Sequence, residues 1–198
     1  MTNWTTLARA GTASGDDIIL CRRGEIFEIR YNGIELMSNV NHQSEDQLAL
    51  RAMRRLGFNA RRILVGGLGL GFTLRAVLDL AVPEAEVTVC ELIPEVAEWN
   101  RGPLGHLADH PLDDPRTSLL IEDVQAHLAK AGKLYDLILL DTDNGPDFLV
   151  RTGNTGLYRQ SGLVLVANAL ATDGLAAFWS ATVSAEFERR LSAQPWSW

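Results

Sequence analysis

Short apolar segments separated by turn signals fill residues 17–40, and apolar residues at helical spacing follow from residue 44. The turn signals are Arg23-Gly24 and Asn32-Gly33. The pair Asn-Gly is a strong signal for a β-hairpin. This pattern predicts a small antiparallel meander, with strands near residues 18–21, 26–29 and 34–37.

From residue 44 the apolar residues recur at helical spacing. Ser44 and Gln47 have the spacing of a capping box, and the helix is predicted to end at Gly57. The change of period places a boundary near residue 43. It separates an N-terminal β-meander, residues 1–43, from a core domain, residues 44–198.

Short apolar runs then alternate with helical stripes along the rest of the chain. The runs are residues 62–66, 86–90, 117–121, 135–140 and 175–179. The alternation predicts an α/β fold, a doubly wound and mostly parallel sheet with strand order 3-2-1-4-5. Before the fifth run we expect a helix capped by Ser161 and a turn at Asp173-Gly174, and after it a final helix from Ser184.

A glycine-rich turn joins the first run to its helix. It holds Gly66, Gly67, Gly69 and Gly71, and glycine lets the backbone approach a ligand without a Cβ in the way. No Gly-Lys-Ser/Thr follows, which excludes a P-loop, and Phe72 stands where a dinucleotide fingerprint needs its third glycine. The remaining pattern, G-x-G-x-G, is that of nucleoside sites of the S-adenosylmethionine type. The alternative is a turn tightened only for strand–helix packing.

Carboxylates follow the second and third runs. Glu91 ends the second, where its two oxygens can accept both ribose hydroxyls of a nucleoside. Glu122 and Asp123 follow the third, and we place both in the cofactor site with Gly67, Gly69 and Gly71. Asp123 can accept from an adenine amino group, and it can equally serve as a helix N-cap. For Glu91 the alternative is a solvated strand-end carboxylate.

The fourth run leads into Asp141-Thr142-Asp143-Asn144-Gly145-Pro146. Two acids and an amide are poor packing material, since buried carboxylates are costly unless paired. We expect a functional loop with Asp143 and Asn144 at the substrate, although Asp, Asn, Gly and Pro also form plain turns.

Composition narrows the class of protein. The chain has 198 residues, 46% of them hydrophobic, and a net charge of −7, which argues against a surface that tracks nucleic-acid phosphates. No apolar run reaches 18 residues, so we expect no membrane span. The N-terminus lacks a basic stretch followed by an apolar one, and two cysteines suit a reducing compartment, so we expect a cytoplasmic protein.

The histidines and cysteines suggest no metal site. His42, His106, His110 and His127 lack metal-ligand spacing and are expected at the surface. Cys90 lies in an apolar run and is predicted to be inert packing.

Taken together, these motifs resemble the spermidine synthase (polyamine aminopropyltransferase) family, which has a methyltransferase-like Rossmann fold. The resemblance is carried by the meander, the turn at residues 66–71, Glu91, Asp123 and the loop at residues 141–146. It implies that Glu91 holds the ribose, that Asp123 contacts adenine and that Asp141 deprotonates the attacking amine. The implied co-substrate is decarboxylated S-adenosylmethionine, or S-adenosylmethionine itself, with a small amine as acceptor and no metal.

The chain departs from the family pattern at several points. Gly69 replaces the aspartate of G-G-G-D-G-G, residues 44–48 lack the tyrosine of the acidic stretch, and the D-x-x-D-P loop is altered. The antiparallel hairpin that normally closes the sheet is also absent, which leaves the fifth strand as an apolar edge. Because exposed edges invite pairing, we expect a homodimer or a swapped element there, helped by Trp196 and Trp198.

Three functions from different classes follow. The first is an aminopropyltransferase acting on a diamine or a related amine. The second is an S-adenosylmethionine-dependent methyltransferase, and the third is a non-catalytic nucleoside-binding or assembly protein on the same fold.

Overall fold

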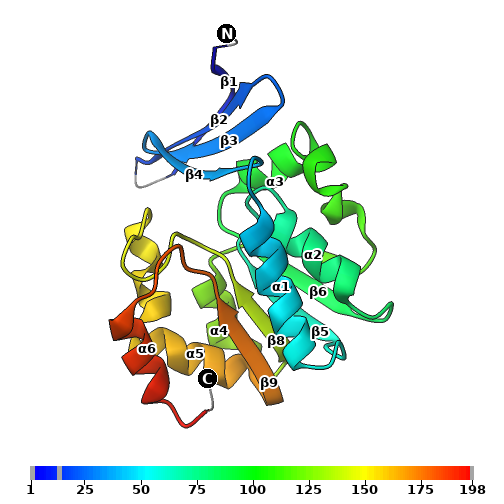
Figure 1. Ribbon diagram of the computed structural model, residues 1–198, viewed down its shortest axis with the longest axis vertical. Helices are drawn as coiled ribbons and strands as arrows, with labels where there is room; N and C mark the ends of the chain where they lie inside the picture. Colours follow the sequence, from blue (N-terminus) through cyan, green and yellow to red (C-terminus); the bar gives the residue numbers. More distant parts are fainter. Residues whose placement is uncertain (1–2, 13–14, 197–198) are drawn as a thin grey trace.

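Two sheets form the molecule in the computed structural model, which describes residues 3–12 and 15–196 (Figure 1). The smaller is antiparallel, with order β1-β2-β3-β4. Its strands are β1 (Thr5–Gly11), β2 (Asp17–Arg23), β3 (Ile26–Tyr31) and β4 (Ile34–Ser38). The predicted meander is confirmed, and Asn32 and Gly33 both have positive φ, as a tight hairpin turn requires. Strand β1 was not predicted, because Ala10 is its one buried residue and no alternation marks it.

The larger sheet is parallel and has the predicted order. Its sequence of strands is β7-β6-β5-β8-β9, which is 3-2-1-4-5 when β5 is counted as the first. The strands are β5 (Arg62–Gly66), β6 (Glu86–Glu91), β7 (Thr117–Ile121), β8 (Tyr135–Leu140) and β9 (Leu170–Phe178). The α/β fold class is therefore confirmed.

Helices cover both faces of this sheet, which explains why its central strands are apolar throughout. Successive side chains of a strand point to opposite faces. Ile63 and Val65 pack with α1 (Gln43–Arg55) and α2 (Phe72–Leu80), while Leu64 packs with α4 (Val124–Ala131) and α5 (Gln160–Ala169). The remaining helical segments are α3 (Pro94–Arg101), α6 (Ala185–Ser192), and the 3-10 turns η1 (Gly105–Ala108), η2 (Pro111–Asp113) and η3 (Thr152–Tyr158).

Two of the four predicted helix caps are wrong. Helix α1 begins at Gln43, so Ser44 lies inside its first turn, and the N-cap residue His42 makes no side-chain capping bond. Helix α5 begins at Gln160, which likewise places Ser161 inside the helix. Asp123 and Ser184 are N-caps as predicted, and their side chains accept hydrogen bonds from backbone N–H groups two and three residues on.

The predicted turn at Asp173-Gly174 is also wrong, because both residues lie within β9. Asp173 has a φ of 63°, and the pairing with β8 skips from Leu170 to Leu175. The two residues therefore form a bulge in a longer strand, and turn-forming residues in a strand often mark such a bulge.

The small sheet lies over the carboxyl ends of the parallel strands (Figure 1). Its apolar face, with Leu20, Phe27 and Ile29, shares one buried cluster with Leu70 and Trp99 of the larger unit. This contact holds the small sheet above the glycine-rich turn. The boundary near residue 43 stays a prediction.

No helix in residues 3–12 and 15–196 is both long and apolar enough to span a membrane. Trp196 packs against the core beside α6, and its indole N–H donates to the Leu191 carbonyl at 3.2 Å. Trp198, which we expected to help cover β9, lies outside the described residues.

Candidate active site

A cavity of about 610 Å³ lies between the two sheets, at the carboxyl ends of the parallel strands. Eight of the nine predicted site residues line it: Gly67, Gly69, Glu91, Glu122, Asp123, Asp141, Asp143 and Asn144. Gly71 lies behind the cavity instead. It is the N-cap residue of α2, with a φ of 86°, and its N–H donates to the Leu68 carbonyl at 2.8 Å.

The glycine-rich turn is closely packed at two positions, against backbone at Gly67 and against the end of the Met37 side chain at Gly69. A Cβ on Gly67 would lie 2.1 Å from the carbonyl oxygen of Asp141, and a Cβ on Gly69 would lie 2.4 Å from Cε of Met37. Both residues have positive φ, which favours glycine. The first contact joins the turn to the loop after β8, and the second joins it to β4 of the small sheet.

Glu91 is held by the backbone of this turn. Its Oε2 accepts from the Leu68 N–H at 3.1 Å, and its Oε1 accepts from the Ile93 N–H at 2.8 Å. The side chain is buried, and loss of water raises the pKa of its carboxyl while these N–H donors partly oppose the rise. Each oxygen retains a lone pair, so Glu91 can still accept from a ligand's hydroxyl groups.

Asp123 and Glu122 are adjacent in sequence but have different surroundings. Asp123 uses Oδ1 to accept from the Gln125 N–H at 2.8 Å, so its N-cap role leaves Oδ2 free of any protein donor among the described residues. Both oxygens of Glu122 are engaged. Oε1 lies 2.8 Å from Nδ1 of His127 and Oε2 lies 2.6 Å from Nζ of Lys130, and the hydrogen bonds to these two side chains lower the pKa of Glu122, the one from Lys130 more strongly.

The Asp141 carboxylate is hydrogen-bonded to the helix that follows the glycine-rich turn. Its Oδ2 accepts from the Thr73 hydroxyl at 2.5 Å, and Thr73 belongs to the first turn of α2. Burial raises the pKa of Asp141 to about 6, against the opposing effect of the Thr73 hydrogen bond. Near neutral pH this carboxyl group is therefore mostly ionised, and it is a stronger base than an ordinary aspartate.

Asp143 is buried and surrounded by hydrogen-bond donors from its own loop. Oδ1 accepts from the N–H groups of Asn144 and Val150 at 2.8 and 2.7 Å. Oδ2 accepts from the Arg151 N–H at 3.0 Å and from Nδ2 of Asn154 at 2.9 Å. These four bonds show that Asp143 fixes the shape of the loop, and Asn144 is one of the residues that line the cavity.

The sequence did not predict the cavity residues that the small sheet contributes, and of α1 it indicated only residues 44–48, by their resemblance to the family's acidic stretch. The cavity residues of these two elements include Met37 and the carboxylates Glu28, Glu35 and Glu45. Glu28 is 6% exposed between two apolar neighbours on β3, with its carboxylate 2.7 Å from Arg30. The sequence offered one signal for Glu28, which is a charged residue between two apolar residues of a predicted strand. With these residues the cavity is lined by eight carboxylates and by two arginines, Arg23 and Arg151.

The prediction that all four histidines lie at the surface is wrong for His127. It is 9% exposed, and its Nε2 lies 2.6 Å from the Tyr135 hydroxyl while Nδ1 faces Glu122. Cys90 is buried beside them as predicted, and loss of water raises the pKa of its thiol to about 12.

Residues 41–191, more than half of the chain, match the family described as "Spermine/spermidine synthase domain". The chain belongs to this family. Among relatives, it is 40% identical to polyamine aminopropyltransferase 2 of Pseudomonas aeruginosa over 90 residues, which are 43% of this chain and 26% of that protein. It is 32% identical to polyamine aminopropyltransferase 1 of Hyperthermus butylicus over 122 residues, which are 59% and 40% of the two chains.

Solved structures of the spermidine synthase family share the fold. The chain superposes on spermidine synthase from Thermotoga maritima with a TM-score of 0.72 and 20% identity, covering 87% of this chain and 56% of that one. A spermidine synthase in complex with the transition state analogue AdoDATO gives the same TM-score and identity, with 87% and 57% coverage. The chain thus spans less than two thirds of the length of each of these relatives.

Proposed function

We propose that the protein transfers an aminopropyl group from decarboxylated S-adenosylmethionine to a small amine, as spermidine synthases do. One observation carries the proposal. Three strand-end carboxylates, Glu91, Asp123 and Asp141, line a single cavity beside Gly67 and Gly69. That arrangement suits an adenosine group whose attached sulfonium lies against the glycine-rich turn.

In this reaction an amine nitrogen attacks the methylene next to a sulfonium. The new C–N bond forms as the C–S bond breaks, and the electron pair of that bond neutralises the sulfur and releases 5′-methylthioadenosine. The attacking amine must first lose a proton, because a free ammonium has a pKa of about 10 and no lone pair.

Asp141 is our candidate for positioning this amine and accepting its proton. Its pKa of about 6 is closer to that of an amine than the pKa of an exposed aspartate is, which makes the transfer less unfavourable. The loop carrying Asn144 would form the acceptor side of the cavity. We keep Asp143 as part of that side, in the role of holding the loop rather than contacting the amine.

The charge of the cavity supports the choice of co-substrate. The eight carboxylates of the cavity outnumber its two arginines, so it favours cationic ligands. The carboxylate of S-adenosylmethionine would need a cationic partner, and the residues that flank Gly69 are the apolar Leu68 and Leu70. Decarboxylated S-adenosylmethionine and a diamine are both cations without a carboxylate, so both suit the cavity. The cysteines Cys21 and Cys90 are unpaired, which fits our proposal of a cytoplasmic enzyme.

The test compares three ligands and two variants. By calorimetry we expect 5′-methylthioadenosine and decarboxylated S-adenosylmethionine to bind more tightly than S-adenosylmethionine. With decarboxylated donor and putrescine, Asp141→Asn should lower kcat by about 10²- to 10⁴-fold and leave the affinity for 5′-methylthioadenosine nearly unchanged. Asp79→Asn, at a side chain 62% exposed on α2, is the matched control and should retain full activity.

Two outcomes would overturn the proposal. A preference for S-adenosylmethionine with methyl transfer would establish a methyltransferase. No binding of any of the three nucleosides would leave a non-catalytic protein on this fold. A normal rate in Asp141→Asn would show that Asp141 does not take part in the transfer.

A further inference from the structure

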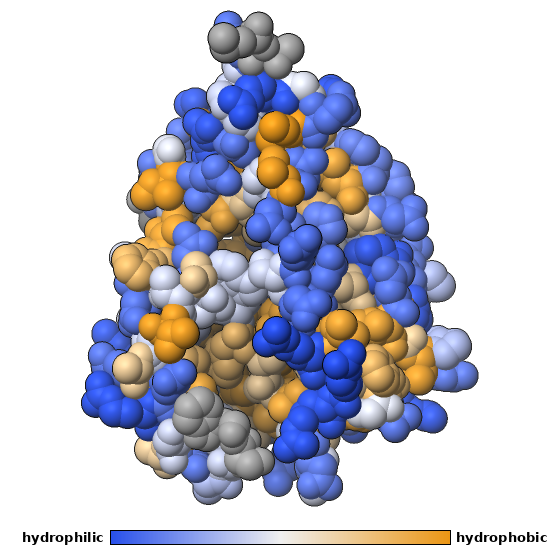
Figure 2. All heavy atoms as spheres, in the orientation of Figure 1, coloured by the Kyte–Doolittle hydropathy of each residue, from blue (hydrophilic) through white to orange (hydrophobic). Residues whose placement is uncertain are grey.

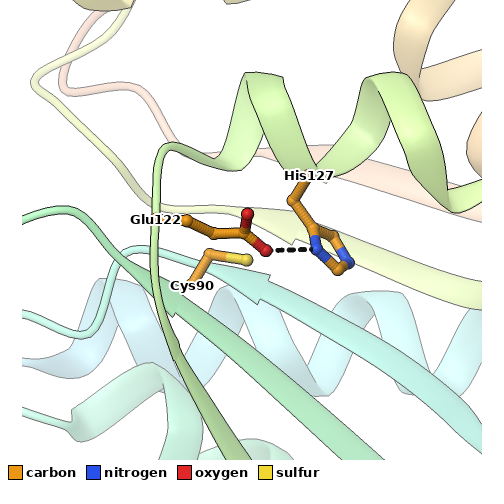
Figure 3. A group of neighbouring side chains, drawn as sticks. All are labelled: Cys90, Glu122 and His127. Carbon is orange, nitrogen blue, oxygen red and sulfur yellow. Dashed lines mark hydrogen bonds and ion pairs between the residues drawn. The ribbon is translucent and has the colours of Figure 1, made fainter.

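Cys90, Glu122 and His127 bring three different metal-ligand groups together at the edge of the cavity, which Cys90 and Glu122 line. The Cys90 sulfur, a Glu122 carboxylate oxygen and a His127 ring nitrogen all lie within 4.8 Å of one another. Figure 3 shows the three side chains pointing toward a common point, from the ends of β6 and β7 and from α4. We propose that these residues form a binding site for a zinc-like transition-metal ion.

The donor set favours zinc over magnesium or calcium. Thiolate, imidazole and carboxylate are all zinc ligands, whereas the hard cations prefer oxygen alone. In a tetrahedral zinc site the ligand atoms lie about 3.3–3.5 Å apart, given bond lengths of about 2.0–2.3 Å. His127 Nδ1 and Glu122 Oε1, now 2.8 Å apart, would separate slightly, and the sulfur would move closer.

Tyr135 supplies the outer contact that a ligating histidine needs. Its hydroxyl lies 2.6 Å from Nε2 of His127. With the metal on Nδ1, the ring carries its proton on Nε2 and donates it to Tyr135, which fixes the ring's orientation. Such outer contacts commonly raise metal affinity by about 10- to 100-fold.

The metal has a route to the site and a balanced exchange of protons. Cys90 and Glu122 both line the 610 Å³ cavity, so the fourth position of the ion would open into it and take water. On binding, the Cys90 thiol loses its proton to solvent and forms the sulfur–metal bond, while the Nδ1 proton of His127 moves to Nε2 through solvent. No oxidation or reduction is involved.

The surroundings favour a divalent cation. Besides Glu122, the carboxylates of Asp123 and Glu91 act electrostatically on Cys90, and Lys130 is the opposing cation. Lys130 is paired with the second oxygen of Glu122 and its side chain is 63% exposed, so water screens its charge.

Co²⁺ is the probe for the test, because a cobalt–thiolate bond gives a charge-transfer band. Protein stripped with chelator and kept reduced should bind one equivalent of Co²⁺, with the band, and Zn²⁺ should displace it. Cys90→Ser should lose the band and weaken Zn²⁺ binding by at least about 100-fold, measured against a chromophoric chelator. Cys21→Ser, at the other buried cysteine, is the matched control and should behave as the wild type.

A second variant separates ligation from folding. Tyr135→Phe keeps all three ligands and should retain the band while weakening Zn²⁺ binding by about 10- to 100-fold. At a free Zn²⁺ concentration of 100 times Kd, the Tm of the wild type should rise by about 5–10 °C, and that of Cys90→Ser should not.

The proposal does not depend on the aminopropyltransferase function. It is overturned if the wild type binds no stoichiometric Co²⁺, if Cys90→Ser keeps the band, or if Cys21→Ser loses it. A folded Cys90→Ser protein, established by its circular dichroism, makes each of these results decisive.

Discussion

Thr73 controls how readily Asp141 ionises. Its hydroxyl donates to the Asp141 carboxylate at 2.5 Å, and a hydrogen bond to the charged form of an acid lowers its pKa. Burial nevertheless prevails and leaves the pKa at about 6. The balance between these two effects sets the pH range in which Asp141 can take a proton from an amine.

Removing the Thr73 hydroxyl should therefore move the acid limb of activity. If the ionised form of Asp141 accepts the proton of the amine, kcat/KM should rise with pH through about 6 in the wild type. In Thr73→Val the charged form loses a donor, the pKa rises, and the acid limb should shift to higher pH. Initial rates from pH 5 to 8 measure the shift, and Thr73→Ser should retain the wild-type profile. An identical limb in Thr73→Val would contradict the assignment.

At the scale of single residues, the sequence predicted where the strand-end carboxylates lie but not which groups are hydrogen-bonded to the buried polar side chains. Glu91, Asp123 and Asp141 were predictable because parallel strands bring their carboxyl ends to one edge of a sheet. The partners of Asp143 and His127 were not, because they depend on how a loop folds back and on where a helix faces. Asp143 thus fixes its own loop, and His127 is buried rather than exposed.

The loop between β8 and η3 is the element whose shape depends most on one side chain. Asp143 accepts four hydrogen bonds, three of them from backbone N–H groups of residues 144–151. Backbone groups of an irregular loop need such partners when they leave solvent. Asn144 and Arg151, which line the cavity, are placed by these bonds.

Asp143→Asn should loosen this loop. An amide presents one acceptor oxygen and one NH₂ group, so two of the four donors would face another donor. We expect a loss of about 2–4 kcal/mol of stability and faster hydrogen–deuterium exchange in residues 144–151. The KM for the amine should rise, with little change in nucleoside affinity. Asp147→Asn, in the same loop but bonded to Ser184, is the control, and equal exchange in both variants would argue against this role.

At the level of elements, the parallel sheet was predictable and the small sheet was not fully so. Apolar runs alternating with helical stripes specify a parallel sheet covered on both faces, and its order was confirmed. In the small sheet, apolar segments and turn signals predicted three strands but not which of their residues line the cavity. Met37 and Glu28 could be placed only once the sheet's packing over the turn was known.

On the scale of the whole molecule, β9 is the feature that remains open to a partner. Among the described strands it pairs with β8 alone, and an apolar hollow of about 450 Å³ lies between it and α6. Figure 2 shows apolar side chains in the lower middle of this face, beside the hydrophilic side of α1. An apolar strand edge of this kind favours pairing with another chain.

We therefore still expect a homodimer in which a second copy covers β9. Light scattering at micromolar concentration should give twice the monomer mass. Val183→Lys, at an 82% exposed residue on the rim of the hollow, should shift the mass toward the monomer. Val164→Lys, also exposed but on α5, should not. A monomeric wild type would reject the prediction.

Met37 reaches Gly69 from a part of the chain that the family match does not include. The match begins at residue 41, so the small sheet lies outside it while the strand-end carboxylates Glu91, Asp123 and Asp141 lie within it. The cavity is therefore built from two parts of the chain, and the family match includes only one of them. Substitutions in the small sheet could therefore reshape the ligand cavity while the strand-end carboxylates opposite it stay unchanged.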